Sequence, residues 1–543
     1  MNVLLVYPRF PKTFWSFDGV LEMVGRKVLL PPLGLITVAA LLPASWSLRL
    51  VDGNIREVSE ADWAWADLAI FSAMLVQKRD LARQIEMARA HDLPVAVGGP
   101  FATSTPGAPE LAAADFLILD EGEITVPAFV AALARGETRG RFGAGGERPD
   151  VSLSPLPRFD LLELEAYDMM AVQFSRGCPF QCEFCDIIVL YGRKPRTKSP
   201  DQLLAELEAL YALGWRRDVF LVDDNFIGNK RNVKCLLPRL LAWQRQKGFP
   251  FSFTTEASVD LAADDALMTQ MVACGFRRVF LGIETPDEAS LVAVHKLQNT
   301  RSSLEQAVEA ITAKGLQVMA GFILGFDGEQ AGAGRRIVDF VTRTSIPVAM
   351  LGVLQALPNT ALWHRLEREG RLLHGDGRFD EGVQTNLVNF RPTRPMPEIA
   401  AEFLEAFTQL YDPRTYLDRV YAYVGKLGAT RPGRTAGKGK GLRRHLGQVK
   451  ALRGVLVLFW RQGLVRPSRW RFWHHLLAVA IRRPWLLDQY LWMLMLNEHF
   501  LGYRSLVVDQ VTAQLQKPEA LQQPNPSALV APQERPAAEL AGR

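Results

Sequence analysis

The stretch Arg176-Gly-Cys-Pro-Phe-Gln-Cys-Glu-Phe-Cys-Asp186 contains three of the five cysteines of this chain within eight residues. Its spacing places Cys178, Cys182 and Cys185 on one short loop, where their thiolates can converge on one metal centre. Iron–sulfur clusters are normally held by four cysteines. Three ligands on a four-iron cluster leave one iron open, as in catalytic rather than structural metal sites. Such an iron can bind a substrate or a cofactor.

Two other interpretations of the motif are a zinc site that lacks one ligand and three unrelated thiols. The remaining cysteines, Cys235 and Cys274, lie in stretches predicted to be helical and have no motif spacing. Five cysteines with three in one group argue against a disulfide framework and for a reducing compartment. We therefore predict that the three grouped cysteines hold a [4Fe-4S] cluster.

Length and composition predict a globular protein of two or three domains, since the chain has 543 residues, 48% of them hydrophobic and 22% charged. The N-terminal sequence MNVLLVYPRF lacks the charged start and long apolar core of a signal peptide and is typical of a strand. No uninterrupted apolar run is long enough to cross a bilayer. We expect a cytoplasmic location.

Residues 1–135 alternate short apolar strands with helical stretches such as Gly34–Leu42 and Lys78–His91. The predicted strands are Val3–Tyr7, Ser47–Asp52, Leu68–Ala73, Val95–Gly98 and Phe116–Asp120. This alternation predicts an α/β domain with a doubly wound parallel sheet covered on both faces. Ligands of such sheets bind at the carboxyl ends of the strands. Ser72, Gly98 and Gly99 fall at those ends.

A segment rich in Gly and Pro, residues 136–166, is interpreted as a linker. Strands and helices alternate again in residues 167–394. The predicted strands are Met170–Ser175, Val219–Asp223, Phe251–Glu256, Val279–Glu284, Val318–Leu324 and Val348–Gln355. Six such units fit a partial (β/α)6 barrel, in which residues at the carboxyl ends of strands are functional. Candidates at those ends are Asp223, Asp224, Asn225, Glu256 and Glu284.

Residues 395–510 show helical apolar periodicity and are predicted to form a mostly helical C-terminal extension. Residues 511–543 are rich in Pro, Gln and Ala and are expected to be disordered.

With the aromatic Phe184 before its last cysteine, the motif resembles the signature of the radical S-adenosylmethionine (SAM) family. In that family the open iron holds the amine and carboxylate of SAM, which is reductively cleaved to a 5′-deoxyadenosyl radical. The resemblance implies a flavodoxin, a ferredoxin or a reductase as electron donor. It also implies SAM contacts by the following residues: Asp223, Asp224 and Asn225 near the amino group, Glu284 near the ribose, and the strand from Gly321 to Gly325 near adenine. Each piece alone is also typical of a helix cap or a turn.

The first domain resembles the cobalamin-binding domain that one class of radical SAM proteins carries. The resemblance lies in Pro31–Leu35, Val51-Asp52, Gly98–Pro100 and Glu121–Glu123. It implies that Ser72, Gly98 and Gly99 contact cobalamin, although two glycines can also simply close a tight turn. The Asp-x-His-x-x-Gly motif of classical cobalamin domains is absent, and the single histidine before residue 135 is His91. Coordination of cobalt by a histidine is therefore not expected.

The pair of cofactors implies C-methylation, in which a radical takes hydrogen from an unactivated carbon and methylcobalamin supplies the methyl group. Further stretches resemble a bacterial subfamily that includes hopanoid C-2 methylases. These stretches are Thr13–Phe17, Val222–Lys230, Thr255–Ser258, Leu357–Thr360 and Tyr411–Pro413. They are cofactor and scaffold motifs, so the substrate is left open as a small molecule or a lipid such as a hopanoid. One alternative is a cobalamin-type cyclase or rearrangement enzyme without methyl transfer.

Between Asp418 and Asp488 the chain has sixteen Lys or Arg and no Asp or Glu, whereas the rest of the chain carries a net charge of −11. This basic segment also contains Trp460, Trp470 and Trp473. Basic residues with tryptophan on amphipathic helices suit an anionic membrane surface, which predicts peripheral membrane association. The plain alternative is a helical domain with a Trp-rich core. A metal-stabilised nucleic-acid-binding protein is a more distant hypothesis.

Overall fold

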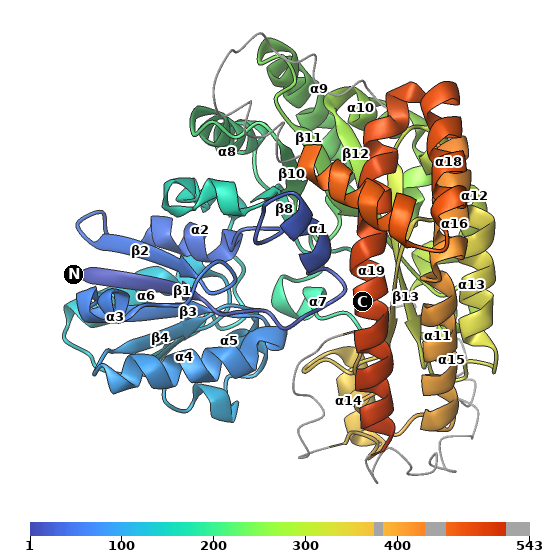
Figure 1. Cartoon of the computed structure of the whole chain (residues 1–543). Coiled ribbons are helices and arrows are strands. Elements are labelled where there is room, and N and C mark those ends of the chain that lie inside the picture. The colour runs from blue at the N-terminus through green and yellow to red at the C-terminus, as the bar shows by residue number, and fades with distance from the viewer. Residues whose placement is uncertain (374–383, 429–451, 517–543) are drawn as a thin grey trace.

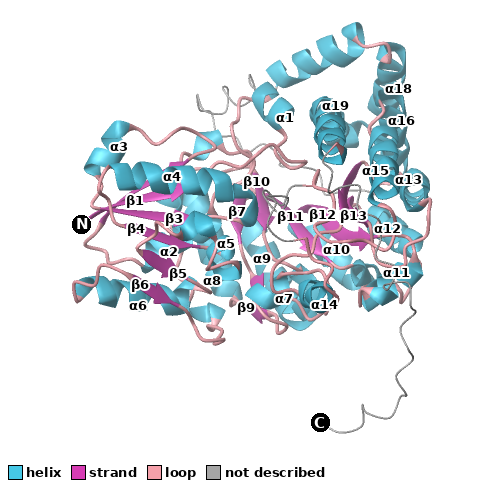
Figure 2. Ribbon diagram, turned by 90° about the horizontal axis from the view of Figure 1, so that it is seen from below, coloured by secondary structure: helices cyan, strands magenta, loops and turns pink. Residues whose placement is uncertain are grey.

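The computed structural model describes residues 1–373, 384–428 and 452–516. Two parallel sheets and a layer of C-terminal helices follow one another across the molecule in both views (Figures 1 and 2). Each sheet is built from six strands. The loops at the carboxyl ends of the strands of the first sheet reach the second, and this arrangement creates the site described below.

The first sheet has the strand order β2-β1-β3-β4-β5-β6, and all its pairs are parallel. Its strands are β1 (Asn2–Tyr7), β2 (Ser47–Asp52), β3 (Leu68–Ser72), β4 (Val95–Gly98), β5 (Phe116–Ile118) and β6 (Gly140–Phe142). Alternate residues of the central strands are buried on opposite faces. One face packs against α2 (Leu33–Leu41) and α6 (Gly122–Ala134). The other packs against α3 (Glu60–Trp65), α4 (Lys78–Ala90) and α5 (Pro100–Ser104).

The strand β6 lies in the segment that the sequence assigned to a linker. Gly140–Phe142 pairs with β5 at the edge of the first sheet. Its Phe142 ring contacts Phe116 and Phe129, with ring centroids 6.4 and 5.8 Å apart. A three-residue strand between glycines has too little apolar pattern to be recognised from sequence.

The second sheet has the order β14-β13-β12-β11-β10-β7 and is also parallel throughout. Its strands are β7 (Met170–Val172), β10 (Asp218–Leu221), β11 (Ser252–Ala257), β12 (Phe276–Glu284), β13 (Gln317–Leu324) and β14 (Val348–Val353). The intervening helices are α8 (Pro200–Ala212), α9 (Lys230–Gln246), α10 (Asp265–Cys274), α12 (Leu304–Ala313) and α13 (Ala333–Thr344). Within the described residues β7 and β14 do not pair with each other, so the barrel is open. The predicted α/β architecture with a partial (β/α)6 barrel is confirmed.

Local signals set the ends of these elements. Ser199 caps α8 in a capping box with Gln202, which satisfies two backbone N–H groups at the start of the helix. Gly275 ends α10 with a φ of 102°, a conformation that other residues rarely adopt, and β12 begins directly after it. The β–α repeat is therefore encoded locally as well as by the apolar strands.

The C-terminal helices are α15 (Met396–Leu410), α16 (Pro413–Lys426), a helix over residues 452–460, α18 (Arg469–Arg482) and α19 (Leu487–Leu515). The N-terminal segment inserts against them, because Phe14 packs on Phe500 and Tyr411 and α1 (Asp18–Met23) packs along α19. The expected disordered tail began at residue 511, but α19 continues to Leu515. Residues 517–543 lie outside the described residues. None of the described helices combines the length and apolarity that a membrane span requires.

Candidate functional site

The cysteine loop leaves the second sheet after β7. It is flanked by a small antiparallel pair, β8 (Ser175–Arg176) and β9 (Arg196–Thr197), and includes the short helix α7 (Ile187–Leu190). Cys182 is buried, whereas Cys178 and Cys185 are partly exposed. Burial raises the pKa of both the Cys178 and the Cys185 thiol, and each of these thiols interacts electrostatically with Cys182. The three predicted ligands therefore share one small region of the fold.

Two aspartates that follow β10 bind the backbone at the start of this loop. Asp223 accepts hydrogen bonds from the N–H groups of Phe174 and Ser175, at 2.7 and 2.9 Å, and from the Ser175 hydroxyl at 2.8 Å. Asp224 accepts a hydrogen bond of 3.0 Å from the N–H of Gly177, next to the first cysteine. The strand β7 ends at Val172, before the predicted end at Ser175, and the N–H groups of Phe174 and Ser175 bond to Asp223 instead of a neighbouring strand.

Asp223, Asp224 and Glu256 form an acidic group at the carboxyl ends of β10 and β11. Burial raises their pKa values to about 7, about 6 and about 8, in that order. Repulsion between the carboxylates adds to the effect. Asn225 lies beside them, bonds to Ser258 at 3.1 Å and contacts the Cys178 thiol. Arg176 lowers the pKa of Asp224 but does not offset its burial, so the group is partly protonated near neutral pH, and a cationic ligand beside it would favour the ionised carboxylates.

Glu284 ends β12 at an irregularity in the strand pairing, and its φ of 67° lies in the left-handed region. Its carboxylate forms a buried ion pair with Lys296. Gly282 allows this pair to lie against the strand, since a Cβ atom there would be 2.5 Å from a Glu284 oxygen and 2.7 Å from Lys296 Nζ. Glu284, a predicted site residue, is therefore paired with Lys296, which the sequence analysis did not predict.

Lys296 also faces the cysteine loop. Burial would lower its pKa, but Glu284 and Cys182 outweigh that effect and the pKa is raised. Nearby, the Gln298 amide donates to the Cys182 sulfur at 3.5 Å. A positive charge and an amide donor beside the sulfurs stabilise negative charge there. Both residues follow α11 (Glu288–Ala293): Lys296 directly precedes a short 3-10 helix, Leu297–Asn299, and Gln298 lies within it, and this stretch carries no recognised motif.

The donor set suits a multinuclear iron–sulfur cluster. Thiolates are the soft ligands that such clusters use. Within the described part of the chain, no three His, Cys, Asp or Glu side chains gather closely enough for a single ion. Cys178 and Cys185 each interact electrostatically with Cys182, so the three thiols can bind one cluster together. With a cationic Lys296 beside them, the residues present fit the cluster.

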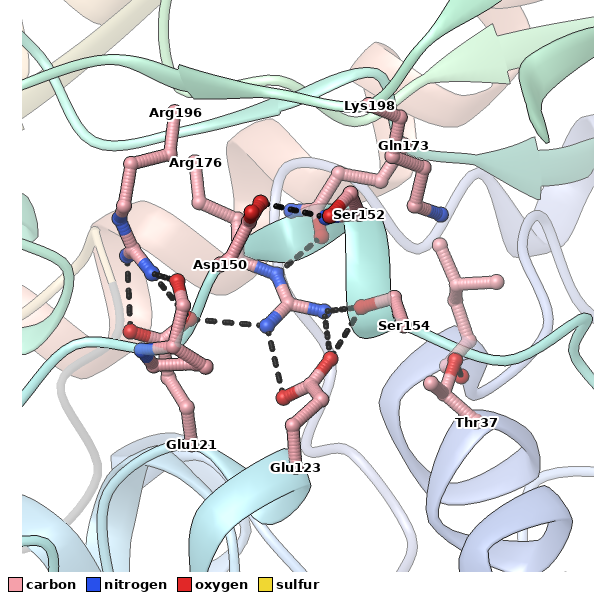
Figure 3. Close-up of polar contacts among 12 residues, drawn as sticks. Thr37, Glu121, Glu123, Asp150, Ser152, Ser154, Gln173, Arg176, Arg196 and Lys198 are labelled. Atoms are coloured by element: carbon pink, nitrogen blue, oxygen red, sulfur yellow. Dashed lines mark hydrogen bonds and ion pairs between the residues drawn. The ribbon is translucent and has the colours of Figure 1, made fainter. Parts of the chain in front are cut away.

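Side chains from the first domain grip the same loop, as Figure 3 shows. Arg176, two residues before the first cysteine, donates to Glu121 at 2.8 Å and to Glu123 at 2.8 and 3.0 Å. Arg196 on β9 donates to Glu121 at 2.7 Å, and the Ser154 hydroxyl bonds to Glu123. We call these five residues the acidic clamp. All five side chains are largely or fully buried.

The cysteine loop is also bound by residues of α14 (Ala361–Arg368), which follows the barrel in sequence. Arg365 pairs with Glu183, which lies between Cys182 and Phe184, and also with Asp327 at 2.8 Å. The N–H of Leu362 donates to the Glu183 carbonyl at 2.9 Å. The cysteine loop is thus fixed from three directions by parts of the chain far apart in sequence.

The inner face of the open barrel carries a mostly apolar side next to the acidic group. Phe280 on β12 and Met350 on β14 flank Gly321 on β13, whose added Cβ would lie 3.0 Å from the Phe280 ring. Trp15, from the N-terminal segment, packs edge-on to Phe280 at 5.5 Å and donates to the Met350 sulfur at 3.2 Å. The second predicted glycine, Gly325, turns the chain out of β13 with a φ of 93°.

In the first domain the structure brings Ser72, Gly98 and Gly99 together. Ser72 and Gly98 are register partners at the carboxyl ends of β3 and β4. A Cβ on Gly99, whose φ is 89°, would lie 2.6 Å from the Ser72 hydroxyl. His91 follows α4 before β4 begins, at the opposite edge of the sheet, where it stacks on Trp63. It therefore lies away from the predicted cobalamin contacts.

Comparisons with known proteins agree with this geometry. A sequence model of the Radical SAM superfamily matches residues 172–341, and one of a domain of unknown function, DUF4070, matches residues 360–513. The chain is 58% identical to an uncharacterized methyltransferase of Synechocystis sp., over 95% of this chain and 94% of the relative. It is 34% identical to the hopanoid C-2 methylase of Rhodopseudomonas palustris, over 92% of this chain and 93% of the relative.

The fold is also shared with a solved structure. The cobalamin-dependent S-adenosylmethionine radical enzyme OxsB, with aqua-cobalamin bound, matches with a TM-score of 0.57 at 16% identity. The match covers 97% of this chain and 82% of that one. It extends across both sheets and the C-terminal helices.

Proposed function

The chain belongs to the radical SAM methyltransferase family that includes the hopanoid C-2 methylase of Rhodopseudomonas palustris, and from this premise we propose that it methylates an unactivated carbon of a lipid such as a hopanoid. The proposed cofactors are a [4Fe-4S] cluster, SAM and cobalamin. When bound, they supply the radical that activates the carbon and the methyl group that it receives. Electrons would come from a flavodoxin, a ferredoxin or a reductase.

The observation that carries the proposal is that acidic and apolar side chains lie next to each other on the second sheet, where Glu256 of β11 and Phe280 of β12 are register partners. Asp224 and Glu256 belong to the acidic group, with pKa values raised to about 6 and about 8. SAM carries two positive groups, a sulfonium and an ammonium. A cation near these carboxylates favours their ionised forms, so charge complementarity supports binding of SAM here. In this proposal Glu284 and the Gly321 strand hold the ribose and adenine.

The apolar side supports a hydrophobic substrate. Trp15, Phe280 and Met350 present an aromatic and thioether surface next to the predicted SAM site. Such a surface can orient a polycyclic hydrocarbon and keep water away from a reactive carbon. The lipid class is the finer part of the proposal, and the kinship with a hopanoid methylase supports it.

The residues of this chain have separate tasks in the proposal. Cys178, Cys182 and Cys185 bind the cluster, and Lys296 balances its negative charge. Asp223 fixes the backbone that carries the cysteines. Ser72, Gly98 and Gly99 leave room for cobalamin at the edge of the first sheet, because side chains larger than these would fill that edge.

The test is anaerobic reconstitution with iron, sulfide and hydroxocobalamin, followed by desalting and quantitation of the bound cofactors. About four irons and one cobalamin per chain are expected. Iron without cobalamin would contradict cobalamin-dependent methylation. SAM labelled in its methyl group is then incubated with hopanoid lipids and a reductant, and label is expected in the lipid.

Other outcomes of this assay separate the alternatives. SAM cleavage with a rearranged or cyclised product and no label would favour radical chemistry without methyl transfer. Salt-sensitive binding of nucleic acid with no SAM turnover would favour the nucleic-acid hypothesis.

A further inference from the structure

The C-terminal helices expose a concentration of large apolar side chains. Nine of the seventeen exposed large hydrophobic residues in the described ranges fall within residues 452–485. They are Leu452, Leu456, Trp460, Leu464, Val465, Trp470, Leu477, Ile481 and Trp485. Every tryptophan that is exposed in the described part of the chain is among them, and Trp470 is 75% exposed. Exposed apolar patches of this kind mark interaction sites.

The helix α18 has two apolar faces. Phe472, Leu476 and Val479 are buried and pack inward. Trp470, Leu477 and Ile481 lie at i, i+7 and i+11 and are exposed. Helical periodicity places these three on one side of the helix. A helix that packs only on its own domain needs one apolar stripe. The second, exposed stripe of α18 therefore indicates contact with a binding partner.

The helix over residues 452–460 repeats this pattern. Leu452, Leu456 and Trp460 are spaced four residues apart and all are exposed, so they form a stripe along one side. The helix is attached to α18, since Phe459 packs on Trp473 with ring centroids 5.2 Å apart and Trp473 donates to the Gly463 carbonyl at 2.8 Å. We call residues 452–485 the outer helical pair. Its α18 lies at the margin of the molecule in Figures 1 and 2.

The outer helical pair is also strongly basic. It belongs to the segment between Asp418 and Asp488, which has sixteen Lys or Arg and no acidic residue. Arg453, Arg469 and Arg482 are exposed beside the apolar stripes. The electrostatic complement of this surface is negative.

We propose that the outer helical pair docks on the surface of an anionic lipid bilayer, with its helices lying in the interface. Tryptophan and aliphatic side chains enter the boundary between headgroups and acyl chains, and the arginines bind the anionic headgroups. Phosphates of a nucleic acid would satisfy the arginines but leave Leu477 and Ile481 in water. A symmetric contact with a second copy of the chain would bring the basic surface against itself. The inference goes beyond the proposed methyl transfer and does not depend on it.

The test is co-sedimentation of the full-length protein with vesicles of phosphatidylcholine, with and without phosphatidylglycerol. Binding is expected to the anionic vesicles and to weaken with salt, together with a blue shift of tryptophan fluorescence. The triple variant Trp470→Ser/Leu477→Ser/Ile481→Ser should lose binding by at least about tenfold, since it removes the whole exposed apolar stripe of α18. The matched control Leu153→Ser/Leu156→Ser/Leu213→Ser changes exposed residues elsewhere and should bind like the wild type.

A charge variant separates headgroup attraction from apolar insertion. Arg453→Gln/Arg469→Gln should weaken binding to anionic vesicles by about fivefold for each arginine. Equal binding of the wild type and the triple variant would overturn the proposal. So would salt-sensitive binding to single-stranded DNA without binding to vesicles, or a dimer in sedimentation equilibrium that the triple variant abolishes.

Discussion

Arg176 and Glu123 form a buried ion pair, with Nη2 and Oε1 2.8 Å apart, that joins the first domain to the loop bearing the cysteines. The two residues are 53 positions apart in sequence, and their side chains are 11% and 5% exposed. Removing one partner of such a pair leaves an uncompensated charge in the interior, which is costly. This pair therefore ties the stability of the chain to the placement of its cysteines.

Glu123→Gln should lower the free energy of unfolding by roughly 3 kcal/mol, because Arg176 loses part of its counter-charge in a buried position. Urea denaturation of the protein at neutral pH measures the effect. Glu137→Gln is the matched control, since its ion pair with Arg135 is exposed and should contribute less than about 1 kcal/mol. Equal losses in both variants would contradict a special role for the clamp.

The same ion pair predicts a dependence on pH. Burial alone would raise the pKa of Glu123, but Arg176 outweighs it and lowers that pKa from 4.5 to about 2. The pair therefore stabilises the folded state above pH 4.5, and this contribution is lost as the pH falls from 4.5 towards 2. Acid titration of unfolding should show a steeper loss for the wild type than for Glu123→Gln in that window. Parallel curves would refute the assignment.

Glu256 should make the stability of the protein depend on pH in the opposite direction to Glu123. Burial, with repulsion from Asp224 and Asp223, raises its pKa from 4.5 to about 8. The folded state without ligand then holds a proton that the unfolded state releases, so stability falls as the pH rises from 4.5 through 8. Glu256→Gln should be more stable than the wild type at pH 8, by roughly 1 to 3 kcal/mol, and equally stable at pH 4. If the stability of Glu256→Gln relative to the wild type were the same at pH 4 and at pH 8, the raised pKa of Glu256 would be contradicted.

Cys182→Ala should abolish binding of iron and cleavage of SAM, because two thiolates cannot replace three around a cluster. Iron content and the release of 5′-deoxyadenosine measure this after anaerobic reconstitution. Cys235→Ala, on the outer helix α9, is the control and should keep both properties. Residual SAM cleavage by purified Cys182→Ala protein would exclude Cys182 as a ligand.

Lys296→Met should shift the midpoint potential of the bound cluster to a more negative value, since a positive charge near the sulfurs is removed. A redox titration followed by electron paramagnetic resonance measures this directly, without activity. Lys296→Arg keeps the positive charge, so its midpoint potential should stay close to that of the wild type. Lys314→Met removes a lysine on the surface beside Asp265 and should leave the midpoint potential unchanged. An unchanged midpoint potential in Lys296→Met would show that Lys296 does not interact with the cluster.

Trp15→Ala should reduce methyl transfer by at least about tenfold while SAM is still cleaved. Trp15 contacts Phe280 and Met350 on the apolar side of the barrel and makes no contact with the cysteine loop that the structure describes. Measuring labelled lipid and 5′-deoxyadenosine in one assay separates the two steps. Trp46→Ala, in the first domain, is the matched control. Equal loss of both products would show that Trp15 supports the cofactors instead.

The sequence predicted the strands well because they are apolar runs bounded by glycine and polar residues. Ser47–Asp52 and Val95–Gly98 coincide with β2 and β4. The strand before the cysteines ends earlier than predicted, at Val172, because the N–H groups of Phe174 and Ser175 bond to the Asp223 side chain and not to a neighbouring strand. That effect is tertiary and leaves no trace in local sequence.

The candidate site was predictable only where a motif exists. The cysteines have their spacing, and the acidic residues have their places at the ends of strands. Lys296 lies in a stretch without a motif, and its meeting with Glu284 depends on how that stretch folds back over β12. The clamp between Glu121 and Arg196 joins residues 75 positions apart, so it depends on how two sheets are placed relative to each other.

The three-way grip on the cysteine loop has an evolutionary consequence. Glu121 and Glu123 come from the first domain, Asp223 from the barrel and Arg365 from beyond it, so no single segment contains a complete support for the metal-binding loop. The three parts must therefore be inherited together, and exchange of one with a distant relative would succeed only if the matching charges travelled with it. A chimera that replaces the first 142 residues should need Glu121 and Glu123 restored before its loop can be loaded with iron.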